Sequence, residues 1–263
     1  HSQHRSNPPL TAYTSTPLAN ESFSMPNHIA IFGANGTIGS EFTRALSSHY
    51  PEATIHAFSR RPQDSAAQNI TTHQLDYLDE AALKNAAKEV SEQAPLDLVI
   101  VATGILHTDE IMPEKSLRDL SADKFMQLYQ ANTIVPALIA KYFVPILNKQ
   151  QTVLFAALSA RVGSISDNHL GGWYSYRASK AALNMIIRNV AIETRRTNKN
   201  AIVCALHPGT VDSALSEPFQ KNVPEDKLFT AEFSVSQLLQ VIDKLSTDDS
   251  GKVFAWDGSE IQP

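Results

Sequence analysis

Short apolar runs alternate with longer segments of helical period from His28 to the end of the chain, and this alternation restricts the fold more than any other feature. Runs that are apolar throughout are typical of parallel strands that helices cover on both faces. We therefore predict an α/β fold with a doubly wound parallel sheet. The expected strands are His28 to Phe32, Thr54 to Phe58, Asp97 to Ala102, Thr152 to Leu158, Ala201 to Leu206 and Val253 to Trp256. The expected helices are Ile38 to Ser48, Asp79 to Glu92, Ala122 to Leu147, Tyr174 to Arg195 and Val235 to Leu245.

The first part of the chain differs in composition from the rest. Residues 1–24 are rich in Ser, Thr, Pro and Asn, show no apolar period and precede Met25, so we interpret them as a disordered leader or a tag. Residues 25–263 contain no Pro- or Ser-rich linker, which predicts a single domain. The chain has neither a signal-peptide pattern nor a run of about 18 apolar residues. These absences favour a cytoplasmic protein that does not span a membrane.

The charge balance argues against a nucleic-acid or membrane-surface partner, because the formal net charge is −5 and no Lys/Arg cluster occurs. The single cysteine, Cys204, lies in an apolar run that is typical of a buried strand, so a disulfide within the chain is excluded. His169 and His207 lack metal-ligand spacing with another His, Cys or acid, so we expect no metal. These features leave a protein that acts on a small molecule.

A glycine-rich turn follows the first expected strand and leads into the first expected helix. Such a turn lets the backbone approach a pyrophosphate closely, while the free amides and the positive end of the helix stabilise its negative charge. The alternative is a tight turn between a strand and a helix that binds nothing. The place of this turn after the first strand favours dinucleotide binding by Gly33, Asn35, Gly36, Thr37, Ile38 and Gly39.

The end of the second expected strand indicates which cofactor is preferred. Ser59 and Arg60 stand there, about 20 residues past Gly39, where a fold specific for NAD usually presents an acid to the ribose. A guanidinium pairs instead with a 2′-phosphate, so we predict that NADP(H) is favoured over NAD(H), with Arg60 as the contact. A solvated basic loop formed by Arg60 and Arg61 is the alternative.

Tyr176 and Lys180 open a long expected helix, and their spacing puts the phenol and the ammonium on one face, one turn apart. Leu183 and Ile187 continue that face, so the lysine lies on an apolar stripe where its charge is costly without a function. A close ammonium favours phenolate and lowers the pKa of a tyrosine, which suits the phenol to proton transfer. The alternative is that Lys180 extends to water and Tyr176 only packs.

Taken together, these motifs resemble the short-chain dehydrogenase/reductase family over residues 27–263. Ala102-Thr103-Gly104 stands where the family carries Asn-Ala-Gly, Asn132 lies in the central helix, and Pro208-Gly209 follows the sixth strand. The stretches at 163–168 and 171–180 look most like the C-factor-like subgroup of carbonyl reductases. The resemblance implies a Rossmann-type fold and a nicotinamide cofactor.

The resemblance also implies roles for single residues. Tyr176 would be the catalytic acid/base, and Lys180 would lower its pKa and bind the nicotinamide ribose. Asn132 would join a backbone carbonyl and a water in a proton relay to Lys180, a hydrogen bond between helices being the alternative. Asp76 would lie beside the adenine, although an acid that only begins a helix is also plausible. The other residues implied at the cofactor are Ala102, Thr103, Gly104, Pro208, Gly209 and Val211.

The catalytic serine is where the chain departs from the family pattern. Ala160 stands three positions before Gly163, where the family usually has serine, and Ser159 precedes it. Adjacent strand residues point to opposite faces, so Ser159 replaces the missing hydroxyl only if the strand end bends or bulges. Ser164 is a second candidate, although a loop serine that caps its own turn is the simpler reading.

The segment Asp212 to Phe229 mixes apolar residues with Pro and charge, as a mobile lid does. Leu215, Phe219 and Trp173 are expected to line an apolar substrate pocket, or else only to pack the lid. The sequence thus predicts an NADPH-dependent oxidoreductase that reduces an aldehyde, ketone or quinone. The alternatives are an NAD(P)-binding signalling or sensor protein of C-factor type and a structural oligomerisation protein. A homo-oligomer through the long helices is also compatible with the sequence.

Overall fold

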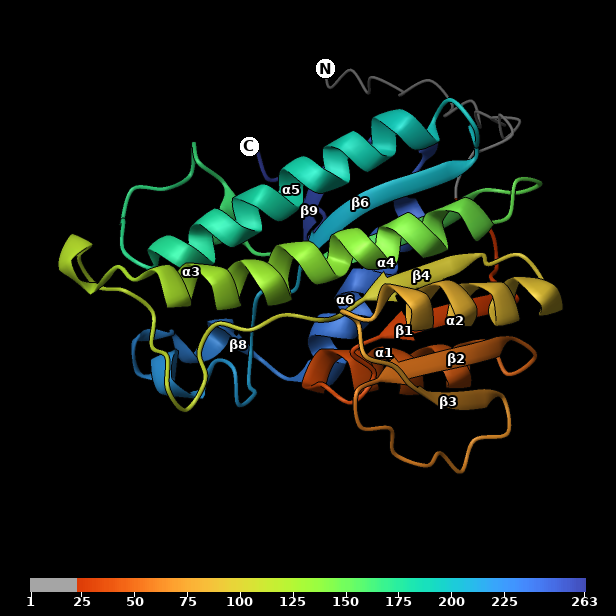
Figure 1. Ribbon diagram of the computed structural model, residues 1–263, viewed down its shortest axis with the longest axis horizontal. Helices are drawn as coiled ribbons and strands as arrows, with labels where there is room; N and C mark the ends of the chain where they lie inside the picture. The colour runs from red at the N-terminus through yellow and green to blue at the C-terminus, as the bar shows by residue number, and fades with distance from the viewer. Residues whose placement is uncertain (1–22) are drawn as a thin grey trace, which may run out of the picture.

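The computed structural model describes residues 23–263, so the expectation for the leader falls outside the described residues except at positions 23 and 24. One sheet of seven parallel strands, in the order β3-β2-β1-β4-β5-β6-β9, forms the centre of the molecule (Figure 1). Its strands are β1 His28–Phe32, β2 Thr54–Ser59, β3 Ile70–Gln74, β4 Leu98–Val101, β5 Val153–Leu158, β6 Ala201–His207 and β9 Val253–Ala255. The predicted doubly wound fold is confirmed.

Helices cover both faces of the sheet, because the strands are apolar on both sides. One layer holds α2 (Glu80–Gln93), α3 (Ala122–Tyr129), α4 (Val135–Phe143) and α5 (Tyr174–Thr194). The other holds α1 (Thr37–His49) and α6 (Ala231–Lys244). The five predicted helices are all present, and α6 begins four residues earlier than predicted because Thr230 caps it at Phe233 N.

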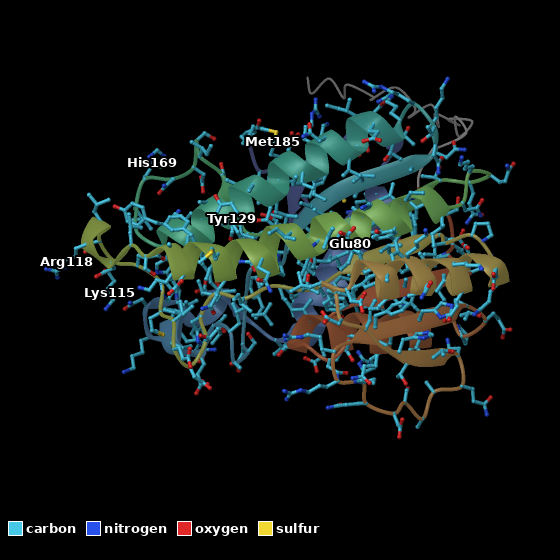
Figure 2. The ribbon with its side chains drawn as sticks, viewed as in Figure 1. Glu80, Lys115, Arg118, Tyr129, His169 and Met185 are labelled. Carbon is cyan, nitrogen blue, oxygen red and sulfur yellow. The ribbon has the colours of Figure 1, made fainter. Side chains whose placement is uncertain are left out.

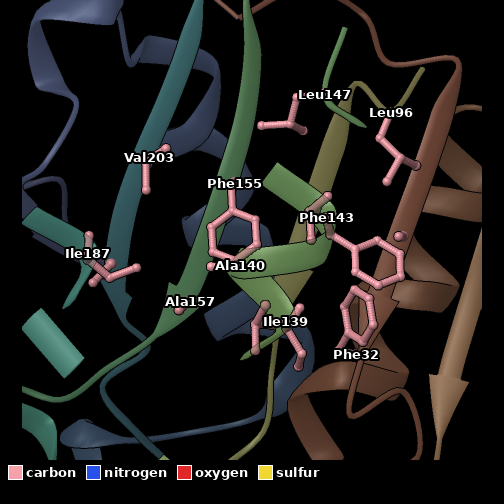
Figure 3. Close-up of a cluster of buried hydrophobic side chains, with 14 of the residues drawn as sticks. Phe32, Leu96, Ile139, Ala140, Phe143, Leu147, Phe155, Ala157, Ile187 and Val203 are labelled. Carbon is pink, nitrogen blue, oxygen red and sulfur yellow. The ribbon is translucent and has the colours of Figure 1, made fainter. Parts of the chain in front are cut away.

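Each face of the sheet has its own buried apolar cluster. Phe32 stacks on Phe58 and meets Phe143 of α4 edge-on, with ring centroids 4.7 Å apart in both pairs. Figure 3 shows Phe32, Phe143 and Phe155 in this cluster, to which the sheet, α4 and α5 all contribute residues. On the opposite face, Phe42 and Leu46 of α1 pack with residues of α6. Burial of this kind contributes about 1.5–3 kcal/mol per large side chain.

The edge strand β3 was missed by the sequence prediction. Its sequence Ile-Thr-Thr-His-Gln is not an apolar run, since this strand pairs only with β2 and leaves most of its side chains partly exposed. The apolar-run criterion detects central parallel strands, which are buried on both faces. An edge strand has no such requirement.

The predicted helix Ala122 to Leu147 is a rod of several pieces. Figure 1 shows α3 and α4 in line, and a π-helical turn at Gln130–Ile134 joins them. Pro136 lacks the amide that would bond to the carbonyl of Asn132, which accounts for the departure from α geometry there. The α-helix ends at Phe143, and a 3₁₀ turn follows because Pro145 interrupts the ladder.

The carboxyl ends of the parallel strands meet at one edge of the sheet, which is where open α/β sheets bind ligands. The glycine turn after β1, the segment after β4, the loop after β5 and the Pro208-Gly209 turn after β6 all lie at this edge. A small second sheet of β7 (Thr210–Val211) and β8 (Leu228–Phe229) flanks it. Within residues 23–263 no helix combines the length and apolar character that a membrane crossing requires.

Candidate active site

The glycine turn brings the end of β1 against the residues that follow β4. Gly33 has φ +76°, and a Cβ there would lie 2.7 Å from the carbonyl oxygen of Ala102. A Cβ at Gly39 would lie 2.0 Å from the carbonyl oxygen of Gly33. Both positions therefore require glycine for the turn itself, as the sequence pattern indicated.

The amino end of α1 is open toward the turn. Gly36 is its N-cap residue, no side-chain hydrogen bond caps the helix, and its first turn holds no acid. The first amides of α1, which belong to Thr37, Ile38 and Gly39, thus lack a side-chain acceptor among the described residues. A Cβ at Gly36 would meet only one atom, at 3.4 Å, so the glycine leaves space outside the turn. An anion fits such a helix end.

Tyr77 is a functional candidate that the sequence reasoning missed. Its hydroxyl accepts a hydrogen bond from Gly33 N at 2.8 Å and donates one to the carbonyl of Phe58 at 2.9 Å. Burial raises the pKa of Tyr77 to about 12, so the phenol stays protonated. One buried hydroxyl thus joins the glycine turn to the end of β2. The apolar periodicity of the sequence does not predict these hydrogen bonds.

The end of β2 lies beside the glycine turn. Ser59 is buried as the last residue of β2, whereas Arg60 is exposed. Asn35 donates a side-chain hydrogen bond to the carbonyl of Arg61, which holds the arginine segment against the turn. A polar cavity of about 270 Å³ opens here, with Asn35 and Ser59 among its lining residues.

Asp76 is exposed after β3, and its carboxylate accepts a hydrogen bond from the amide of Leu78 at 3.0 Å. Asp79, three residues later, is the N-cap of α2 through the amide of Ala82. Asp76 therefore stabilises a local turn, and Asp79 rather than Asp76 caps α2. A position beside adenine stays a prediction.

The segment after β4 joins the glycine turn to the α3 and α5 layer. The Ala102 amide bonds to the carbonyl of Phe32 at 2.8 Å. The hydroxyl of Thr103 is buried without a hydrogen-bond partner in the structure. A Cβ at Gly104 would lie 3.1 Å from Asn132 Oδ1 and 3.3 Å from Lys180 Nζ. Because Gly104 has no side chain, the side-chain amide of Asn132 and the ammonium of Lys180 can lie close to its backbone.

Asn132 lies in the π-helical turn and is fully buried. Its Oδ1 accepts from Ile105 N at 2.7 Å, and its Nδ2 donates to the Ile105 carbonyl at 2.8 Å and to Ser179 Oγ at 3.1 Å. The backbone carbonyl expected from the resemblance is present, and so is the alternative bond between helices. Asn132 thus fixes the segment after β4 against α5.

Tyr176 and Lys180 are both buried on α5, one turn apart. The ammonium lies 5.9 Å from the centre of the Tyr176 ring and donates to the Leu158 carbonyl at 3.1 Å. Burial raises the pKa of Tyr176 to about 12 and lowers that of Lys180 to about 8. The direction for Tyr176 is opposite to the sequence expectation, because desolvation of the phenolate dominates in this environment.

The structure does not bring Ser159 to Tyr176. The Ser159 hydroxyl donates to Asn184 Oδ1 at 2.7 Å, and Asn184 lies about 12 Å along the α5 axis from Tyr176. Ala160 instead packs in the same buried cluster as Tyr176. Ser164 is occupied too, since its hydroxyl donates to the carbonyl of Gln262. The hydroxyl that the family pattern places beside the tyrosine is therefore absent from the position of Ala160.

The turn after β6 closes the edge beside the second sheet. Gly209 has φ +75°, and a Cβ there would lie 2.6 Å from the ring of Phe229. The Pro208 carbonyl accepts from Ser234 Oγ at 2.7 Å, which ties the turn to α6. Val211 is buried in β7. His207, just before the turn, has its pKa lowered to about 4 by burial, so its imidazole is neutral at pH 7.

An apolar cluster surrounds the Tyr176 side chain. Trp173 lies with its ring 6.0 Å from Tyr176 and 5.1 Å from Phe219 of the predicted lid. Phe219 and Trp173 thus pack against the cluster that holds Tyr176, which is compatible with both a substrate pocket and a packed lid, whereas Leu215 is more than a third exposed and lies outside this cluster. The buried members of the cluster are Leu106, Ile111, Leu128, Ala160 and Tyr176.

Metal-ligating side chains do not gather in this region. Among residues 23–263 there is no group of three or more His, Cys, Asp or Glu side chains that could hold a metal ion. His169 is exposed on the loop that leads to α5, at the outside of the molecule (Figure 2).

A doubly wound sheet with a phosphate-type turn and a buried tyrosine–lysine pair defines an α/β oxidoreductase of the Rossmann type. The family model for short chain dehydrogenases matches residues 27–224. The chain therefore belongs to the short-chain dehydrogenase/reductase family, and the predicted membership is confirmed.

Individual relatives agree with this assignment. The chain is 30% identical over 236 residues to 1-hydroxy-2-glutathionyl-2-methyl-3-butene dehydrogenase of a Rhodococcus species, covering 89% of this chain and 98% of the relative. It is 31% identical over 146 residues to C-signal of Myxococcus xanthus, and the match covers 56% of this chain and 82% of that protein. The NADPH-bound carbonyl reductase from chicken fatty liver superposes with a TM-score of 0.75 at 27% identity, and the superposition covers 90% of this chain and 99% of that one. These likenesses support a nicotinamide cofactor and a relation to C-factor-like carbonyl reductases.

Proposed function

We propose that the protein reduces the carbonyl group of a small aldehyde, ketone or quinone with NADPH, and that Tyr176 is the proton donor. The observation that carries this proposal is the burial of Tyr176 and Lys180 one turn apart on α5, at the edge where Gly104 and Asn132 meet. A pair of ionisable groups held on a buried helix face without an ion pair is typical of a catalytic site. The carbonyl reductase from chicken fatty liver supports the choice of reaction.

The described residues fit a dinucleotide. The uncapped end of α1 suits the pyrophosphate, and the space outside Gly36 would otherwise be filled by a side chain. The unpartnered Thr103 hydroxyl and the Lys180 ammonium adjoin the segment after β4, where the nicotinamide ribose would lie. When bound, the nicotinamide supplies the hydride. The remaining residues proposed to contact the cofactor are Gly33, Asn35, Ser59, Asp76, Ala102, Pro208, Gly209 and Val211.

The raised pKa of Tyr176 fits the reductive direction. With a pKa of about 12, the phenol is protonated at pH 7 and can donate its proton to the carbonyl oxygen as negative charge develops there. Lys180, with a pKa of about 8, carries a charge at pH 7 that stabilises the phenolate left behind. Asn132 holds the Ile105 backbone and so fixes a residue that packs against the Tyr176 cluster.

Arg60 is proposed to select NADPH, because it is exposed beside the glycine turn where the 2′-phosphate would lie. We expect Arg60→Ala to raise KM for NADPH roughly 10- to 100-fold, since a charge-assisted hydrogen bond contributes about 1.5–3 kcal/mol. The KM for NADH, which lacks the phosphate, serves as the internal control and stays nearly constant. An equal rise for both cofactors would assign Arg60 a structural role.

Ser159 is not part of the proposed proton transfer, because its hydroxyl is bonded to Asn184. We expect Ser159→Ala to change kcat/KM by less than about threefold and to lower the unfolding free energy by about 1 kcal/mol, the contribution of one buried hydrogen bond. Urea denaturation and initial rates measure the two effects. A large loss of kcat with unchanged stability would contradict this prediction and would show that the Ser159 hydroxyl takes part in catalysis.

A signalling or sensor protein is the second candidate, favoured by the 31% identity to C-signal of Myxococcus xanthus. Consumption of NADPH with benzaldehyde, acetophenone, benzil and 1,4-naphthoquinone separates the two. Turnover of at least one of these supports the reductase, whereas NADPH binding with no turnover of any aldehyde, ketone or quinone supports the sensor. Homo-oligomer formation and a cytoplasmic location stay predictions from the sequence.

A further inference from the structure

Glu114 is the most deeply buried carboxylate among the described residues, with no exposed surface. It lies on the segment between β4 and α3, far in sequence from the residues it contacts. Its Oε2 accepts from Ser175 N at 3.1 Å, and its Oε1 accepts from Ser175 Oγ at 2.9 Å. A buried carboxylate that bonds only to one residue of another element is an unusual arrangement.

The partner residue is in the first turn of the helix that carries Tyr176. Trp173 is the N-cap position of α5, and its side chain makes no capping bond. Ser175 is the second helical residue, so its amide is one of the donors that a helix leaves unpaired. Glu114 supplies the missing acceptor from outside the helix, and a carboxylate is favoured at this end of a helix dipole.

The backbone of Glu114 holds a strained turn in front of the helix. Its carbonyl accepts from Trp173 N at 2.6 Å. Gly171, Gly172 and Trp173 have φ of +67°, +68° and +51°, and Trp173 is the one non-glycine residue with positive φ in the described chain. A tryptophan in this conformation carries strain that surrounding contacts must offset. The side-chain and backbone bonds of Glu114 are such contacts.

The strained residue is also the one that lies against the catalytic candidate. The Trp173 ring packs between Tyr176 and Phe219, at 6.0 Å and 5.1 Å. The two residues that follow Glu114 are held as well, because Asp119 accepts hydrogen bonds from the amides of Lys115 and Ser116. Figure 2 shows Lys115 and Arg118 at the outer tip of this segment, beside the beginnings of α3 and α5.

We propose that Glu114 is a positioning residue of the carbonyl reductase site: it fixes Trp173 as the wall of the substrate pocket and, through Ser175, fixes the Tyr176 phenol. This inference rests on the proposed function, since it assigns Glu114 to the same site. Glu114 touches neither substrate nor cofactor in this role. It acts through the first turn of α5 and through the Trp173 backbone.

The test compares three variants with the same NADPH assay and the best carbonyl substrate of the panel above. Glu114→Ala removes both acceptors, and Glu114→Gln keeps an oxygen for the Ser175 amide. Asp79→Ala is the matched control, because it removes an ordinary helix cap from α2 at the Ala82 amide. Stability, NADPH affinity, KM and kcat are measured for each.

We expect Glu114→Ala to lower kcat/KM about tenfold or more, with NADPH affinity within about twofold of the wild type. Glu114→Gln should recover most of that loss. Asp79→Ala should lower the melting temperature, as Glu114→Ala does, and leave kcat/KM unchanged. In a Trp256→Phe background, the fluorescence of Trp173 should shift to longer wavelength in Glu114→Ala and not in Asp79→Ala.

Two results would overturn the inference while the reductase remains active: an unchanged kcat/KM in Glu114→Ala, or equal kinetic losses in Glu114→Ala and Asp79→Ala. If Glu114→Ala does not fold, Ser175→Ala decides, because it removes the hydroxyl contact at 2.9 Å and leaves the Glu114 carboxylate in place; an unchanged KM, kcat and fluorescence in Ser175→Ala would reject the role. Failure of the proposed function is distinct, since the wild type would then reduce no carbonyl compound.

Discussion

Tyr176→Phe is expected to lower kcat for carbonyl reduction by about 10³-fold, the size of effect that a well-placed general acid provides. The phenol is buried, its pKa of about 12 keeps it protonated, and the apolar cluster around it leaves the ring in place when only the oxygen is removed. NADPH affinity should change little, because the glycine turn and the end of β2 are untouched. Single-turnover rates and fluorescence titration with NADPH measure the two quantities.

Tyr174→Phe is the matched control for this experiment. Tyr174 is the first residue of the same helix, and 38% of its surface is exposed. Removing its hydroxyl should leave kcat within about twofold of the wild type. If Tyr176→Phe kept most of its activity, the proton donor would have to be another group and the proposed function would be rejected in its present form.

Lys180→Met is expected to lower the activity and to raise the stability of the folded protein. The variant keeps most of the unbranched side chain and removes the ammonium, so kcat should fall by about 10²-fold as the phenolate loses its counter-charge. At pH 7 the free energy of unfolding should rise by about 1–3 kcal/mol, because Lys180 is charged in both the folded and the unfolded state and burial of that charge is costly. Urea denaturation and steady-state rates test both parts.

The pH dependence of this stability follows from the lowered pKa. The folded-state pKa of Lys180 is about 8 and the ordinary value is 10.5, so the folded state binds fewer protons between these values. The cost of the buried charge is therefore complete below about pH 8 and is relieved as the pH rises toward 10.5. The stability difference between Lys180→Met and the wild type should narrow over that range.

Lys141→Met is the control for the loss of a lysine charge. Lys141 forms an exposed ion pair with Glu80 at 2.7 Å, and such surface pairs contribute about 0–1 kcal/mol. This variant should not become more stable and should keep its activity. A Lys180→Met variant that is both active and less stable than the wild type would contradict the assigned role.

The central strands and the helices were predictable from the sequence because each leaves a periodic apolar signal. β1, β4, β5 and β6 are buried on both faces and read as apolar runs, and the predicted helix boundaries agree within a few residues. β3 was missed because an edge strand needs no such run. The π-helical turn around Asn132 had a usable signal in Pro136, four residues later.

The parts of the site that follow from local spacing were also predictable. The Tyr176–Lys180 pair and the glycine turn each lie within a few residues of sequence. The hydrogen bonds between Gly33 and Tyr77 and between Ser175 and Glu114 join residues that are far apart in the chain, so no local sequence pattern predicts them. The pKa of Tyr176 was misjudged for a similar reason, because desolvation depends on the whole surrounding fold and not on one neighbour.

Ala160 beside Tyr176 has a consequence for the electronic demands of the reaction. In the proposed reaction, the methyl group of Ala160 leaves the Tyr176 phenol as the proton donor to the carbonyl oxygen, with no second hydroxyl from this position. Activation then depends more on the substituents that the carbonyl compound itself carries. Across a series of para-substituted benzaldehydes, the logarithm of kcat/KM should rise steeply with electron withdrawal, and Ala160→Ser should flatten that slope.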